Sequence, residues 1–275
     1  MDLDEVARGW LELEMDVLVR TRGEELFLRG PMFEPTPQFF PDRWAPTNLA
    51  VKKVLERLLA HVGLGHRGVR VVQFRTSADD IVLDANGRRV GHARAGACAY
   101  FAGFDERGVC LFGVERALLR DPISVVGTLA HEVAHAYRRH HGLEDDDRDG
   151  EEVLTDLTTV FLGFGILTTN ATEVFRARSV GVFGRETSFR AGGYLSLEAM
   201  SHLLAYQAHR RALSRPDVAR VAGHLETAQR DAFRGSLAQL RGQRVHALPP
   251  WAFWAALALA PVAIVALLLA ARHTW

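Results

Sequence analysis

Two histidines and a glutamate in one short stretch constrain this chain more than any other feature of its sequence. The stretch reads Leu129-Ala130-His131-Glu132-Val133-Ala134-His135-Ala136-Tyr137. On a helix, His131 and His135 project from one face, one turn apart, so that two imidazole nitrogens can meet one metal ion at about 2 Å. Glu132 lies about 100° round the helix, where its carboxylate can reach a metal-bound water rather than the metal.

Local signals predict that this stretch lies on a helix. Asp121 suits the cap position, Pro122 suits the first helical position, and Gly142 can end the helix in the left-handed conformation. We therefore expect a helix from Pro122 to about His141.

A catalytic zinc site needs a third protein ligand and one open position. His141 lies ten residues after His131, where metzincin proteases place their third histidine. Those enzymes need a glycine at the position that Arg138 occupies here, and on an unbroken helix His141 would lie about 280° from His131. His140 would lie about 180° away. Both are expected to be surface histidines.

Glu152 is the second candidate for the third ligand, on a helix predicted to begin at Glu151. Asp156 follows four residues later on the same face, where it can hydrogen-bond the outer N–H of a ligand histidine. A simpler reading is also open, because acidic residues in a first turn complement the helix dipole and Asp149 with Glu152 would form a capping box.

The His-Glu-x-x-His and Glu-x-x-x-Asp motifs together resemble the gluzincin class of zinc metallopeptidases over roughly residues 95–170. The resemblance implies Zn²⁺ held by His131, His135 and Glu152, with Glu132 as general base and Asp156 behind a ligand histidine. It also implies that strand 109–115 is the edge strand that binds substrate backbone. Three candidates for the residue that steadies the oxyanion are Tyr194, His202 and Tyr206.

We therefore expect a zinc-dependent peptidase in which Glu132 takes a proton from the metal-activated water and passes it to the leaving amine of a protein or peptide substrate. Two alternatives stay open: a membrane-tethered metal-binding scaffold without catalysis, and a hydrolase of non-peptide amides. Thirty-three basic and thirty-three acidic residues leave no net charge, which gives no electrostatic reason to expect nucleic acid as a partner.

The remaining pattern predicts an α+β fold with a small, mostly antiparallel sheet followed by the active-site helix pair and further helices. Residues 1–245 would form a zincin-like catalytic domain, with a Pro-rich extended segment at 31–47. The other predicted helices cover 3–20, 48–62, 196–211 and 219–240, and the predicted strands cover 69–75, 81–83, 88–91, 97–104 and 109–115. Cys98 and Cys110 are expected to be buried thiols that do not pair.

Residues 251–270 carry no charge, and at 1.5 Å per residue they would span about 30 Å as a helix, the thickness of a bilayer core. This pattern predicts a transmembrane helix at 251–271 and a single-pass membrane protein. Arginines on the N-terminal side of the span favour a cytoplasmic catalytic domain.

Overall fold

The computed structural model of the chain describes residues 3–76, 81–83, 89–92, 98–179, 190–191 and 194–242. The chain divides into two units, Met1–Leu240 and Arg241–Trp275. The helices and strands described below belong to the first unit, apart from the last two residues of the final helix.

A five-stranded sheet with the order β3-β2-β1-β5-β4 forms one layer of this unit. The strands are β1 (Val69–Thr76), β2 (Ile81–Leu83), β3 (Arg89–His92), β4 (Ala99–Phe104) and β5 (Cys110–Glu115). Only the β1–β5 pair is parallel among the described strands of this sheet; the other pairs are antiparallel. The expected α+β class and mostly antiparallel sheet are confirmed.

The identity of the edge strand differs from the prediction. β5 pairs with β1 on one side and with β4 on the other, so it lies inside the sheet. The expectation that strand 109–115 forms the edge is therefore wrong, and β4 is the edge strand on this side. The reason is the parallel β1–β5 pairing, which joins strands far apart in the sequence and leaves no local signal.

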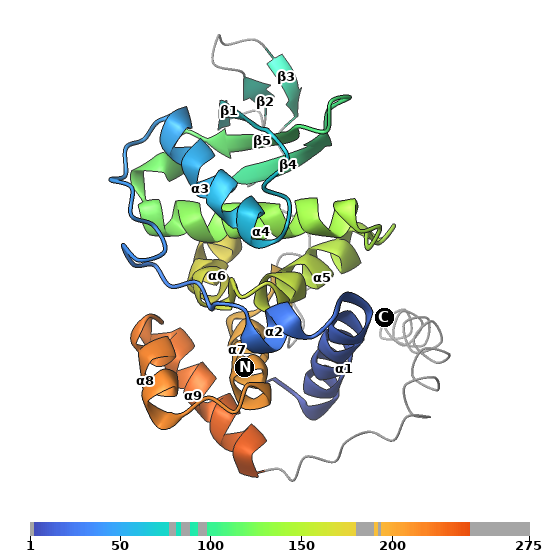
Figure 1. The fold of residues 1–275 in the computed structure, drawn as a ribbon, viewed down its shortest axis with the longest axis vertical. Coiled ribbons are helices and arrows are strands. Elements are labelled where there is room, and N and C mark those ends of the chain that lie inside the picture. The colour runs from blue at the N-terminus through green and yellow to red at the C-terminus, as the bar shows by residue number, and fades with distance from the viewer. Residues whose placement is uncertain are drawn as a thin grey trace, which may run out of the picture. The chain divides into compact units, whose positions relative to one another are not determined.

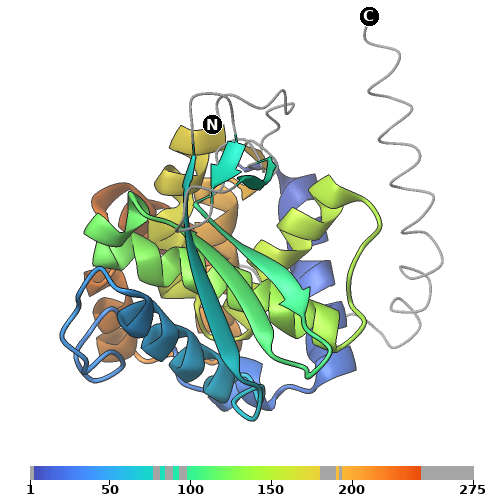
Figure 2. The ribbon, with the colours of Figure 1, turned by 90° about the horizontal axis from the view of Figure 1, so that it is seen from above.

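Helix α4 (Pro122–His140) lies beneath the sheet and contacts β4, and α3 (Asn48–His61) contacts both β1 and α4 (Figure 1). The start of α4 follows the prediction, since Asp121 accepts hydrogen bonds from the N–H groups of Ile123 and Ser124. Gly142 has a φ of 63°, as expected for a left-handed helix end. Seen from above, β1, β5 and β4 lie over α4 (Figure 2).

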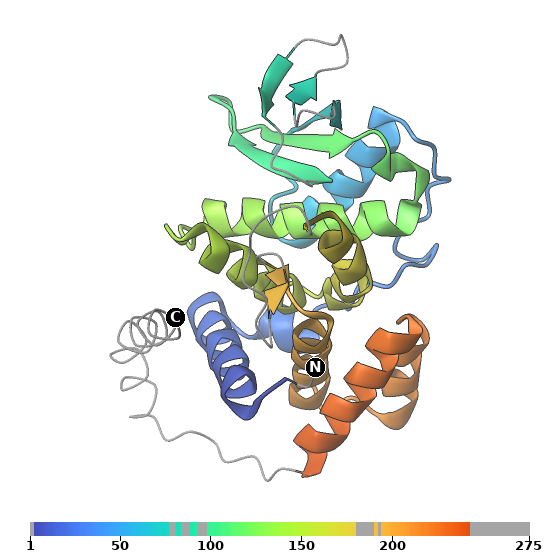
Figure 3. The ribbon, with the colours of Figure 1, turned by 180° about the vertical axis from the view of Figure 1, so that it is seen from behind.

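The other helices form the layers on the far side of α4 from the sheet (Figure 3). Helix α4 packs on α5 and α6, and these pack in turn on α7, while α1 contacts α5 and α7. Their bounds are α1 (Glu5–Arg22), α2 (Glu25–Arg29), α5 (Arg148–Phe161), α6 (Gly165–Ser179), α7 (Leu197–Arg210), α8 (Arg215–Gly223) and α9 (Thr227–Gly242). A short 3₁₀ turn, η1 (Leu118–Arg120), precedes α4, and β6 (Arg190–Ala191) pairs with β7 (Tyr194–Leu195).

The helices differ from the predictions in several respects. α5 begins at Arg148 because Asp147, not Asp149, caps it by accepting a hydrogen bond from the N–H of Gly150. The predicted helix 219–240 is instead two helices, α8 and α9. Helix α6 has no counterpart among the predicted elements.

The Pro-rich segment 31–47 contains no helix or strand and forms hydrogen bonds with neighbouring elements. The Phe33 N–H donates to the Gly163 carbonyl at 2.8 Å, just past the end of α5. The Trp44 Nε1–H donates to the Leu119 carbonyl at 3.1 Å, just before α4. The segment therefore ties the end of α5 to the turn that precedes α4.

The expectation of a membrane-anchored fold needs correction. Among the described residues, no helix has both the length and the apolar character that a membrane span requires. The predicted single-pass membrane protein is therefore wrong for this part of the chain, and the predicted cytoplasmic placement of the catalytic domain loses its support as well. Residues 251–271, the predicted span, lie outside the described residues.

Gly127 sets how closely α4 approaches α6. A Cβ at this position would lie 2.7 Å from both the Leu167 carbonyl oxygen and the Ala171 Cβ. We expect Gly127→Ala to lower the free energy of unfolding by about 1–2 kcal/mol, because overpacking outweighs the gain in helix propensity. Gly9→Ala is the matched control: Gly9 is exposed on α1 and a Cβ there would meet no atom within 4 Å, so alanine should stabilise by roughly 0.5–1 kcal/mol. Urea unfolding measures both, and stabilisation by both variants would contradict the close α4–α6 approach.

Candidate metal centre

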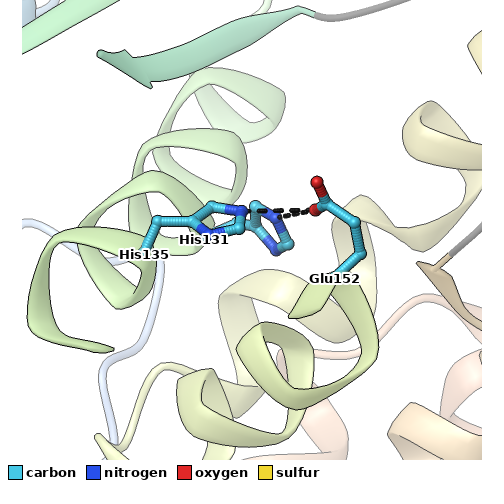
Figure 4. Close-up of side chains that lie close together, drawn as sticks. All are labelled: His131, His135 and Glu152. Atoms are coloured by element: carbon cyan, nitrogen blue, oxygen red, sulfur yellow. Dashed lines mark hydrogen bonds and ion pairs between the residues drawn. The ribbon is translucent and has the colours of Figure 1, made fainter. Parts of the chain in front are cut away.

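The two histidines of α4 and Glu152 of α5 converge on one point (Figure 4). The Nε2 atoms of His131 and His135 each lie 3.2 Å from the same Glu152 oxygen, Oε2. One ligand atom from each of the three residues lies within 4.8 Å of the others. The prediction that α4 and α5 bring these three side chains together is confirmed, and the group could hold a metal ion.

The donor separations are close to those around a small ion with tetrahedral geometry. Ligand atoms about 2.0–2.2 Å from a tetrahedral zinc ion lie about 3.3–3.6 Å from one another. The two N···O separations of 3.2 Å are slightly shorter than this range. With all three donor atoms within 4.8 Å of one another, the group could share one ion.

Each imidazole also contacts a side chain of α5 through its Nδ1 atom, on the side of the ring away from Nε2. Nδ1 of His131 lies 2.8 Å from Asp156 Oδ1, and the other Asp156 oxygen accepts the N–H of Leu195 at 2.9 Å. Nδ1 of His135 lies 3.2 Å from the Thr155 hydroxyl. Both contacts suit an imidazole with its proton on Nδ1 and its lone pair on Nε2, the state that binds a metal.

Buried carboxylates make the cluster favour added positive charge. Burial alone would lower the pKa of His131, but hydrogen bonds with Asp156 and Glu152 outweigh it and raise that pKa well above its ordinary value. The pKa of His135 is raised in the same way: its contacts with the Glu151 and Glu152 carboxylates outweigh the lowering effect of burial. Burial would raise the pKa of Glu152, whereas the two imidazoles lower it strongly. Protons or a metal ion would supply the charge that the site favours.

Glu132 is close enough for its charge to raise the pKa of both histidines, but it does not belong to the donor set. Its carboxylate is buried and its Oε2 accepts the N–H of Phe101 at 2.7 Å. Phe101 is on β4, the edge strand, so Glu132 bridges α4 and the sheet. This position is consistent with the role of base rather than ligand.

The structure separates the other candidate residues from the cluster, with one exception. His140 is exposed and lies 3.0 Å from Arg67, and His141 lies 2.7 Å from an Arg22 nitrogen, so the prediction that neither is a ligand agrees with the geometry. His202 contacts Glu12 and Tyr206 contacts Asp16, all at the α1–α7 interface. Tyr194 alone of the three oxyanion candidates is near the site, with its ring centroid 5.5 Å from that of His131.

Three further residues of the site were not predicted from the sequence: Arg138, Glu151 and Thr155. Arg138 and Glu151 form a two-point ion pair between α4 and α5, and Thr155 lies one turn after Glu151. Burial would raise the pKa of Glu151, but its contact with His135 and its hydrogen bonds with Arg138 lower it to about 2. The helical spacing from His135 to Arg138 and from Glu151 to Thr155 is a signal that could have identified them.

Comparisons of this chain with protein-family models, with curated proteins and with solved structures find no match. The resemblance to gluzincins therefore rests on the residues and geometry of the site alone.

Loss of the Asp156 carboxylate should weaken metal binding without abolishing it. Asp156→Ala removes the group that orients His131 but leaves all three donors in place, so we expect the affinity for Zn²⁺ to fall by about 10- to 100-fold. Competition titration against a chromophoric chelator measures this. An affinity equal to that of the wild-type chain would show that Asp156 does not orient the ligand histidine.

Proposed function

We propose that this chain is a zinc-dependent metallopeptidase of the gluzincin type, acting on protein or peptide substrates. The observation that carries the proposal is the convergence of His131, His135 and Glu152 while Glu132 lies next to them outside the donor set. A site built only for stability uses four protein ligands and has no need of a further carboxylate at that position.

The donor set favours zinc among the divalent ions. Two imidazoles and one carboxylate form the ligand set of several catalytic zinc sites, with the fourth position left for water or substrate. Magnesium and calcium prefer oxygen ligands, so two imidazoles argue against them.

The proposed mechanism assigns one task to each side chain. A zinc ion supplies a Lewis acid that acidifies water and polarises a carbonyl group. Glu132 accepts the proton of the attacking water on Oε1 while the Phe101 N–H holds Oε2, and it then delivers that proton to the leaving amine nitrogen. Phe101 is on the edge strand, so this hydrogen bond attaches the Glu132 carboxylate to the sheet. The carboxylate therefore keeps a fixed direction through both proton transfers.

Tyr194 is the proposed donor to the oxyanion. It lies at the start of β7, beside Leu195, whose N–H is bound by Asp156. The same carboxylate therefore positions His131 and the backbone that carries Tyr194. A phenol O–H there would stabilise the charge that develops on the carbonyl oxygen.

Glu132→Gln separates catalysis from metal binding. The amide oxygen can still accept the Phe101 N–H, but the side chain cannot take up a proton, so we expect the variant to retain zinc and to lose hydrolysis by about 10²- to 10⁴-fold. Metal content is measured by elemental analysis, and activity by mass-spectrometric digestion of a peptide library, with a chelator-treated sample as control.

Two outcomes would contradict the peptidase proposal. Undiminished peptide cleavage by the Glu132→Gln variant would remove Glu132 from the mechanism. Stoichiometric zinc in the wild-type chain with no cleavage of any peptide would favour the metal-binding scaffold or the hydrolase of non-peptide amides.

Tyr194→Phe should reduce kcat by about 10²-fold and change KM little, because the hydroxyl acts on charge that exists only in the transition state. Tyr206→Phe is the matched control, since the Tyr206 hydroxyl donates to Asp16 at 2.8 Å on the α1–α7 interface. Its kcat should equal that of the wild-type chain. Equal kcat values for the two variants would exclude Tyr194 as the oxyanion donor.

A further inference from the structure

A buried arginine lies behind the second ligand histidine. Arg138 is three residues after His135 on α4, and its side chain is 4% exposed. Its Nε and Nη2 donate to the two oxygens of Glu151 at 2.9 and 2.8 Å, and its Nη1 donates to the Thr158 hydroxyl at 3.3 Å. This two-point geometry fixes the plane of the Glu151 carboxylate.

The Glu151 carboxylate, held in this way by Arg138, extends toward His135. Glu151 Oε1 lies 3.7 Å from His135 Nδ1 and accepts the Thr155 hydroxyl at 3.3 Å. The Thr155 oxygen lies 3.2 Å from the same Nδ1. Because the single hydroxyl proton of Thr155 points to Glu151, its oxygen is left to accept the N–H of His135.

We propose that Arg138, Glu151 and Thr155 form a positioning unit that holds the proton of His135 on Nδ1 and presents its Nε2 lone pair to the metal. The unit acts on His135 alone. His131 depends on Asp156, which contacts its Nδ1 directly. This inference rests on the proposed metal site and does not depend on which substrate the site hydrolyses.

The two ligand histidines are therefore supported in different ways. His131 donates straight to a carboxylate, whereas His135 donates to a neutral hydroxyl with a carboxylate behind it. A directly bound carboxylate increases the basicity of an imidazole more than a hydroxyl does. The His135 support should accordingly contribute less to metal affinity than the Asp156 support, while still setting the direction of the ring.

Thr155 is the residue that distinguishes positioning from simple stability. Breaking the Arg138–Glu151 pair would leave a buried charge and destabilise the chain whatever its role at the metal. Thr155 is uncharged and fully buried, and valine has nearly its shape without the hydroxyl. Thr159 is the matched control, since it is equally buried one turn later on α5 and bonds to the Asp156 carbonyl and Thr168 instead of to His135.

The test measures metal binding by the full chain, with Zn²⁺ in competition with a chelator and with Co²⁺ as a spectroscopic probe. Thr155→Val should lower zinc affinity by about 10-fold and alter the visible absorption bands of bound Co²⁺. Thr155→Ser, which retains the hydroxyl, should restore both, and Thr159→Val should leave both unchanged. Equal zinc affinities and Co²⁺ spectra for Thr155→Val and Thr159→Val would overturn the proposal.

A second variant covers the case in which Thr155→Val does not fold. Thr155→Ala, which also removes the hydroxyl and leaves the Arg138–Glu151 pair in place, should then show the loss of zinc affinity, and wild-type affinity in that variant would overturn the proposal. A wild-type chain that binds neither Zn²⁺ nor Co²⁺ would instead remove the metal site itself and, with it, the proposed function. Failure of the positioning unit and failure of the metal site are thus distinguishable.

Discussion

The burial of carboxylates against two imidazoles between α4 and α5 is the interaction on which the rest of the site depends. Glu132, Glu152 and Asp156 are only 7, 8 and 2% exposed, and carboxylates removed from water are costly unless cations or hydrogen-bond donors compensate them. The imidazoles compensate the negative charge of these carboxylates in part, as the raised pKa of His131 indicates. A divalent ion between His131, His135 and Glu152 would compensate the same charge more fully. Folding of the helix pair and binding of a cation are therefore expected to support each other.

The surrounding elements hold the helix pair at the spacing that the donors require. Gly127 lets α4 approach α6 closely, and the edge strand β4 binds Glu132 through the Phe101 N–H. On the other side, the Leu195 N–H binds Asp156, so that β7 is attached to the same carboxylate that supports His131. The proposed general base, the first proposed ligand histidine and the proposed oxyanion donor are thus each linked to the backbone of a strand. A site held in this way loses little entropy on binding an ion, because its donors are already in place.

The core of the site could be predicted from the sequence, because helical periodicity places His131 with His135 and Glu152 with Asp156 whatever the rest of the chain does. Long-range strand pairing could not be predicted in this way. The parallel β1–β5 contact makes β4 the edge strand, and nothing in the sequence of the β4–β5 hairpin indicates that contact. Helix α6 also escaped prediction, because it buries Thr168, Thr169 and Thr172, and polar residues on the buried side obscure an amphipathic pattern. The apolar stretch near the C-terminus led to a membrane-anchored architecture that the described helices do not support.

The central claim is that two imidazoles and one carboxylate from neighbouring helices bind a single zinc ion. X-ray absorption spectroscopy at the zinc edge of the zinc-loaded chain tests it most directly. We predict a shell of nitrogen and oxygen atoms at about 2.0–2.1 Å, with the outer-shell scattering of two imidazole rings that is lost when both histidines are replaced. Sulfur ligands at about 2.3 Å, or a shell without imidazole scattering, would contradict it.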